Sequence, residues 1–228
     1  MNYNIFSYKD DLSNYENNSY KNIIFNNLNN KVEIKNQLKK ELLSYLKSMN
    51  IKKSNHIFIV GLGNDNHTAD SIGPKTLKHI RVNSYLEKLG IKIIGNKVSA
   101  LEPGVLGETG IITERIISSV SKEIKPDLVI LIDSFVSDDI NNLNKCIHIN
   151  NIGLNPASGL SSLNKTIDKK LLGIPVLVIG VVTSILVKFT NGCENYIPYL
   201  LCTKDIDEYV YNISKIIGEG INEVISDL

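Results

Sequence analysis

Two aspartates follow apolar runs in this sequence, and they are the residues best suited to act together in chemistry. Asp70 lies in the polar loop after the run at residues 56–62 (HIFIVGL), and Asp133 directly follows the run at residues 127–132 (DLVILI). In open α/β sheets, reactive groups gather beyond the carboxyl ends of the strands. Two carboxyls with different proton affinities can serve as base and acid toward one water and one amide.

The two side chains are expected to differ in environment. Asp70 lies where a helix begins, so free N–H groups and the helix dipole should favour its ionised form. Asp133 follows an apolar run, and desolvation should raise its pKa. If the carboxyls share a proton they titrate as a unit, and sequence assigns neither role to one residue. The alternative for Asp70 is a simple helix N-cap.

A metal site would need a third ligand beside the two aspartates. His67 and His148 are the candidates, but the residue types that bind zinc or nickel are not clustered at ligand spacing, so no metal and no cofactor is expected. The cysteines are odd in number and lack paired spacing, which argues against a disulfide framework or a structural zinc site; they are Cys146, Cys193 and Cys202.

The elements that position these residues alternate between strands and helices. Strands are predicted at residues 56–62, 91–100, 127–132, 146–150 and 174–181, and helices in the segment that opens near Pro74 and at residues 111–124 and 206–225. The strands are continuously apolar, which indicates a sheet covered on both faces. The pattern predicts an α/β fold, a three-layer α/β/α sandwich with a mainly parallel or mixed sheet.

The first 55 residues differ in composition from the rest and are rich in Asn. An amphipathic helix is predicted from residue 31 onward, with an apolar face made of Ile34, Leu38, Leu42, Tyr45 and Leu46. Before it there is little to bury. We therefore expect an irregular Asn-rich segment at residues 1–30 and a single α/β domain at residues 31–228.

Composition and charge exclude several classes of protein. The net charge of +1 offers no broad field for nucleic acid or anionic lipid. No apolar run approaches the roughly 20 residues that span a bilayer, and the start has no secretory signal. The sequence predicts a cytoplasmic protein without nucleic-acid or membrane partners.

Six ordered motifs resemble those of the spore germination proteases of endospore-forming bacteria. They lie at residues 60–64 (VGLGN), 68–74 (TADSIGP), 98–111 (VSALEPGVLGETGI), 125–133 (KPDLVILID), 153–159 (GLNPASG) and 172–181 (LGIPVLVIGV). Residues 203–222 resemble the closing helix of that family.

The resemblance implies an aspartic-type endopeptidase that degrades small acid-soluble spore proteins in the spore core or forespore during germination. It also implies a zymogen, a homotetramer and a fold similar to that of the hydrogenase maturation proteases. The catalytic aspartates of the family fall on Asp70 and Asp133. The expected substrate-binding residues, in the loops that shape the cleft, are Asn64, Thr68, Glu102 and Ser158.

Some features depart from the family pattern. Where the family commonly reads GVPTVVD, residues 180–186 read GVVTSIL, with Val182 and Leu186 in place of a Pro and an Asp. Few residues precede the echo of the processing region at residues 10–12, so residues 1–9 are expected to be dispensable. Two alternatives stay open: a catalytically degenerate paralogue that binds spore proteins or a sister subunit, and a metal-dependent maturation-type peptidase.

Overall fold

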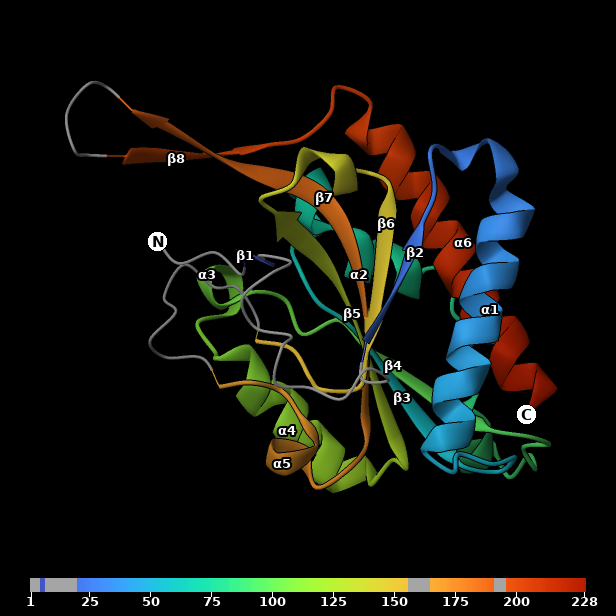
Figure 1. Cartoon of the computed structure of the whole chain (residues 1–228). Coiled ribbons are helices and arrows are strands. Elements are labelled where there is room, and N and C mark those ends of the chain that lie inside the picture. The colour runs from blue at the N-terminus through green and yellow to red at the C-terminus, as the bar shows by residue number, and fades with distance from the viewer. Residues whose placement is uncertain (1–4, 7–19, 156–164, 191–195) are drawn as a thin grey trace.

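A mixed eight-stranded sheet forms the centre of the protein in the computed structural model, which describes residues 5–6, 20–155, 165–190 and 196–228. The strands are β1 (Ile5–Phe6), β2 (Tyr20–Ile24), β3 (His56–Gly61), β4 (Lys97–Leu101), β5 (Leu128–Ser137), β6 (Cys146–Asn150), β7 (Val176–Thr190) and β8 (Tyr196–Leu201). Their order is β2-β6-β7-β5-β3-β4, with β1 beside β5 and β8 beside β7 (Figure 1). β3, β4, β5 and β7 pair in parallel, whereas β6 is antiparallel to β7 and to β2.

Helices cover both faces of this sheet. They are α1 (Lys31–Ser48), α2 (Ile72–Leu77), α3 (Leu106–Thr109), α4 (Thr113–Ile124), α5 (Lys169–Leu172) and α6 (Ile206–Asp227). Short 3-10 turns are η2 (Leu28–Asn30), η3 (Thr68–Asp70), η4 (Ser84–Leu89) and η5 (Ile140–Asn142). α1, α2 and α6 lie on the first face and α3, α4 and α5 on the second (Figure 1). The predicted α/β sandwich is therefore confirmed; its similarity to the hydrogenase maturation proteases stays a prediction.

Each face of the sheet has its own apolar core because the strand residues alternate between them. In β5, Leu128, Ile130 and Ile132 join the core under α1, α2 and α6. Val129 and Leu131 join the core under α4 and α5. This continuous burial is what the unbroken apolar runs predict.

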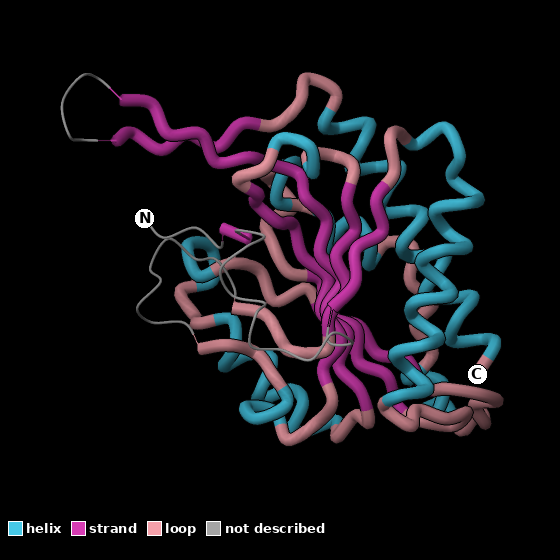
Figure 2. The backbone as a smooth tube through the Cα atoms, in the orientation of Figure 1, coloured by secondary structure: helices cyan, strands magenta, loops and turns pink. Residues whose placement is uncertain are grey.

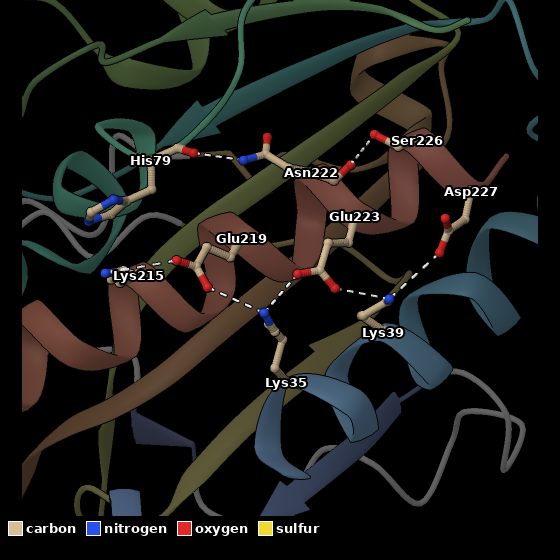
Figure 3. Close-up of polar contacts among 9 residues, drawn as sticks. All are labelled: Lys35, Lys39, His79, Lys215, Glu219, Asn222, Glu223, Ser226 and Asp227. Atoms are coloured by element: carbon tan, nitrogen blue, oxygen red, sulfur yellow. Dashed lines mark hydrogen bonds and ion pairs between the residues drawn. The ribbon is translucent and has the colours of Figure 1, made fainter. Parts of the chain in front are cut away.

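α1 matches its sequence prediction closely, since all five residues of its predicted apolar face are buried. It packs against α6, where Gly220 leaves so little room that an added Cβ would lie 3.2 Å from Leu38 Cδ2. A ladder of ion pairs also joins the two helices (Figure 3), from Lys35 and Lys39 on α1 to Glu219, Glu223 and Asp227 on α6.

The N-terminal segment differs from the prediction of irregular structure before residue 31. Tyr20–Ile24 forms β2, an edge strand antiparallel to β6, and Ile23 is buried. The strand exists because the outer edge of β6 offers unpaired backbone groups, which local composition cannot reveal. Ile5–Phe6 also pairs with β5, at Val136–Ser137. Whether residues 1–9 are dispensable stays a prediction.

Several element boundaries also differ. β5 continues to Ser137, so Asp133 lies inside the strand rather than after it. β7 is 15 residues long and continues into a hairpin with β8 that projects from the body (Figure 2). The helix that opens near Pro74 ends at Leu77, and Leu86 belongs to the separate turn η4. In the described ranges, no helix is both long and apolar enough to cross a membrane.

Candidate active site

Asp133 lies in the middle of the sheet, on β5, opposite Gly180 of β7. By alternation it faces the second side of the sheet, with Val129 and Leu131, and it is 8% exposed. Its Oδ1 accepts a hydrogen bond of 2.8 Å from the backbone N–H of Ser134. A carboxyl in this position has little water and one donor to stabilise its charge.

The surroundings of Asp133 favour its protonated form. Burial raises its pKa well above the ordinary value, and the negative charge of Asp70 raises that pKa further. The hydrogen bond from Ser134 acts in the opposite direction but is the smallest of the three influences. The desolvation that the sequence predicts for Asp133 is thus present, and the two aspartates are electrostatically coupled.

Asp70 is held at the end of η3 by a loop that folds back on itself. The N–H of Asn64 donates to the carbonyl of Asp70 at 2.9 Å, and the N–H of Asp70 donates to the carbonyl of His67 at 2.7 Å. Gly63 has a φ of +107°, and a Cβ there would lie 1.9 Å from the Asp70 carbonyl oxygen. Only glycine permits this approach of the loop to Asp70.

The pKa of Asp70 is raised to about 6, chiefly by burial. A hydrogen bond from the backbone of Asn64 and the charge of His67 lower that pKa, and the charge of Glu108 raises it. The sequence led us to expect that the helix start would favour the ionised form of Asp70. This prediction is wrong, because the effect of burial exceeds the influences that lower the pKa. η3 has three residues and no long dipole, so burial dominates.

Two hydrogen bonds tie the Asp70 segment to the strands around Asp133. The hydroxyl of Thr183 on β7 donates to the carbonyl of Ala69 at 2.6 Å. The N–H of Ile72 donates to Ser134 Oγ at 3.3 Å. Sequence analysis did not identify Thr183 or Ser134 as site residues. Ser134 directly follows Asp133, and Thr183 lies just after the motif at residues 172–181, and these positions were the only signals.

The predicted substrate-binding residues fall in different places. Asn64 and Thr68 lie in the Asp70 loop, where the carbonyl of Thr68 accepts hydrogen bonds from the N–H and hydroxyl of Ser71. Glu102 is exposed after β4, and its charge contributes to a raised pKa of Lys78 rather than acting on the aspartates. Ser158 lies outside the described residues.

Charged side chains connect the Asp70 loop to the neighbouring helices. Asp65 forms ion pairs with Lys75 at 2.7 Å and Lys78 at 2.8 Å, which fasten the loop to α2 and lower the pKa of Asp65. On the other side, Asn66 Nδ2 donates to Glu108 Oε1 at 3.0 Å and so connects the loop to α3.

The two histidines considered as metal ligands have different interaction partners. His67 acts on Asp70 through its charge. His148 is buried on β6, its Nδ1 lies 2.7 Å from Asn22 Oδ1, and burial lowers its pKa to about 4. Within the residues that the structure describes, no three His, Cys, Asp or Glu side chains form a group able to hold a metal ion.

Comparison with known proteins points to one family. The model of the germination protease family matches residues 13–202. The germination protease of Oceanobacillus iheyensis is 40% identical over 164 residues, which cover 70% of this chain and 45% of that protein. The germination protease of Clostridium tetani is 32% identical over 239 residues, covering 84% of this chain and 72% of that protein. The chain thus spans less than half the length of the first relative and about three quarters of the second.

Proposed function

Because the chain belongs to the germination protease family, we propose that it is an endopeptidase in which Asp70 and Asp133 activate water. The observation that carries this proposal is the buried carboxyl of Asp133, whose pKa is raised by desolvation and by the charge of Asp70. A perturbed carboxyl beside a second carboxyl is an arrangement suited to acid–base catalysis.

The proposed mechanism uses the pair with one proton. Asp70 is the less buried of the two, so it ionises first, and the proton stays mainly on Asp133. The ionised carboxylate accepts a proton from water as the water oxygen attacks the scissile carbonyl carbon. The protonated carboxyl donates to the carbonyl oxygen. When the tetrahedral intermediate collapses, a proton passes to the leaving amide nitrogen.

The proposed substrates are small acid-soluble spore proteins, degraded in the spore core during germination. The names of the relatives support a role in germination, and the resemblance implies the substrate class. The net charge of +1 gives no reason to expect nucleic acid as a second partner.

We also propose that the chain self-associates, as the family resemblance implies. The hairpin of β7 and β8 projects from the body (Figure 1), and Tyr199, Leu200 and Leu201 on it are 47%, 43% and 43% exposed. A two-stranded hairpin is marginally stable by itself in water, so contact with a second copy would stabilise it. Sedimentation velocity should show an oligomer that Leu200→Lys dissociates; a monomeric parent chain contradicts this proposal.

The test of the catalytic proposal uses Asp70→Asn and Asp133→Asn, with Asp138→Asn as a matched control at an exposed carboxyl. Each of the first two changes should lower cleavage of a small acid-soluble spore protein by roughly 10²- to 10⁴-fold. The control should cleave like the parent. Near-normal turnover in either active-site variant, in a protein with a native circular dichroism spectrum, removes that residue from the mechanism.

Two further outcomes of the same assay identify the alternatives. Inactivation by a chelator, with recovery on addition of one divalent ion, would replace the proposal with a metal-dependent peptidase. A parent chain that binds the spore protein but never cleaves it would indicate a degenerate paralogue.

A further inference from the structure

A β-bulge interrupts β7 next to the candidate site. The pairing with β5 passes from Phe135 opposite Val182 to Val136 opposite Ser184, so Thr183 is the extra residue. The bulge lies three residues beyond Gly180, the partner of Asp133. Bulges often re-aim a side chain beside an active site.

The side chain of Thr183 is buried and makes a hydrogen bond. It is 1% exposed, and its hydroxyl donates to the carbonyl of Ala69, the residue directly before Asp70, at 2.6 Å. A buried hydroxyl that reaches a backbone carbonyl at this distance forms a strong and well-fixed hydrogen bond.

Most other hydrogen bonds of the Asp70 segment fix its shape rather than its position. The bonds from Asn64 to Asp70 and from Asp70 to His67 lie within the loop and move with it. Among the described residues, two bonds anchor η3 and the start of α2 to neighbouring strands of the sheet: the one from Thr183, and the longer one of 3.3 Å from Ile72 to Ser134.

We propose that Thr183 is a positioning residue that fixes the separation of the Asp70 and Asp133 carboxyls by anchoring η3 to β7. This inference rests on the proposed function of the pair, which it deepens. Interaction between two charges falls with their distance, so a segment released from β7 would lose both the geometry and the coupling of the pair. Misplacement of a reacting group by about 1 Å can cost roughly 100-fold in rate.

The test compares Thr183→Val, which keeps the shape but loses the hydroxyl, with Thr183→Ser, which keeps the hydroxyl. Thr76→Val is the matched control, because Thr76 is equally buried and its hydroxyl has no hydrogen-bond partner among the described residues. Thr183→Val should lower kcat roughly 10- to 100-fold with little change in KM. Thr183→Ser should recover most of the activity, and Thr76→Val should behave like the parent.

A second readout does not depend on activity. Titration of ¹³C-labelled aspartate carboxyls by NMR, assigned with the Asn variants, reports the coupling of the pair directly. The titratable groups that act on Asp70 are His67 and Glu108, and the one that acts on Asp133 is Asp70. In Thr183→Val the pKa of Asp133 should fall, because the charge of Asp70 is farther away; in Thr183→Ser and Thr76→Val it should not change.

The outcomes separate the two proposals. A Thr183→Val protein with parental titration and parental kcat overturns the role of Thr183. A parent chain without peptidase activity overturns the proposed function, while the titration still decides the role of Thr183. If Thr183→Val does not fold, Thr183→Ala, which removes the hydroxyl without adding a methyl group against Ala69, takes its place in both measurements.

Discussion

On the first face of the sheet, α1 and α6 have 18 and 22 residues and run side by side; on the second, α4 has 12 residues and α3 and α5 have four each. The first face is tied by the ion-pair ladder of Figure 3. On the second face, α3 ends at Gly110, and both Gly110 and Gly104, which lies two residues before the helix, have positive φ.

The candidate site includes residues from both faces of the sheet. Asp133 points to the second face, whereas Ala69, next to Asp70, packs against the core of the first. The larger of the two apolar cores lies under the long helices of the first face, so stability should depend mainly on that face. Substitutions on the two faces should therefore separate stability from activity.

The largest expected effect on stability comes from the core of the first face. Leu38→Ala removes a fully buried side chain between α1 and α6 and should lower the free energy of unfolding by roughly 2–5 kcal/mol, measured by urea denaturation. Val32→Ala, on the same helix but at a position 66% exposed, is the control and should change it by less than about 0.5 kcal/mol. The comparison fails if both variants lose similar amounts.

Asp70→Asn should have the opposite effect on stability. Because the pKa of Asp70 is about 6 in the folded chain and 3.8 is its ordinary value, its stabilising contribution is present below pH 3.8 and is lost as the pH rises through about 6. At pH 7 the Asn variant should therefore be more stable than the parent by up to about 3 kcal/mol.

Denaturation at pH 4 and pH 7 checks this sign. The advantage of Asp70→Asn should be small at pH 4 and grow toward pH 7, and Asp138→Asn, at an exposed carboxyl, should show no such trend. A variant that is less stable than the parent at pH 7 would mean that the Asp70 carboxylate stabilises the fold.

Glu108→Gln should change the pH dependence of cleavage more than its rate. The charge of Glu108 helps to raise the pKa of Asp70, and the change to Gln keeps an oxygen that can accept from Asn66. The acid limb of kcat against pH should move to lower pH, with a change of about twofold or less at pH 7 because the side chain is exposed. Movement to higher pH contradicts the electrostatic role.

A small effect on stability is expected from the ladder. Glu223 bridges Lys35 at 2.7 Å and Lys39 at 3.0 Å, but it is substantially exposed. Glu223→Gln should lower the free energy of unfolding by roughly 1 kcal/mol or less, and 1 M salt should remove the difference. A larger loss that persists in high salt would mean that the ladder acts through packing rather than charge.

Sequence patterns predicted the elements whose burial repeats regularly along the chain. The apolar face of α1 lies where the helical spacing indicated, and the strand at residues 146–150 lies where it was predicted and is buried along its whole length. β2 escaped prediction because its five residues are ordered by pairing with β6, a long-range contact that leaves no local signal.

Only part of the candidate site could be predicted from the sequence. The desolvation of Asp133 follows directly from the apolar residues before it. The raised pKa of Asp70 does not, because it depends on how the loop folds against the sheet. The role proposed for Thr183 could not be predicted, since it depends on a β-bulge and on a long-range hydrogen bond that the residue type does not indicate.

The order of strands in the sheet affects how the chain folds during its synthesis. Among the described strands, β6 pairs with β2 and β7 alone, so β2 and β6 can join the β3–β4–β5 unit only through β7. Asn22 and His148, which meet across β2 and β6, are 126 positions apart. The apolar face of α1 likewise packs against α6, which follows it much later in the chain. We therefore expect the apolar face of α1 to stay uncovered until α6 has been synthesised, which favours slow folding and dependence on chaperones.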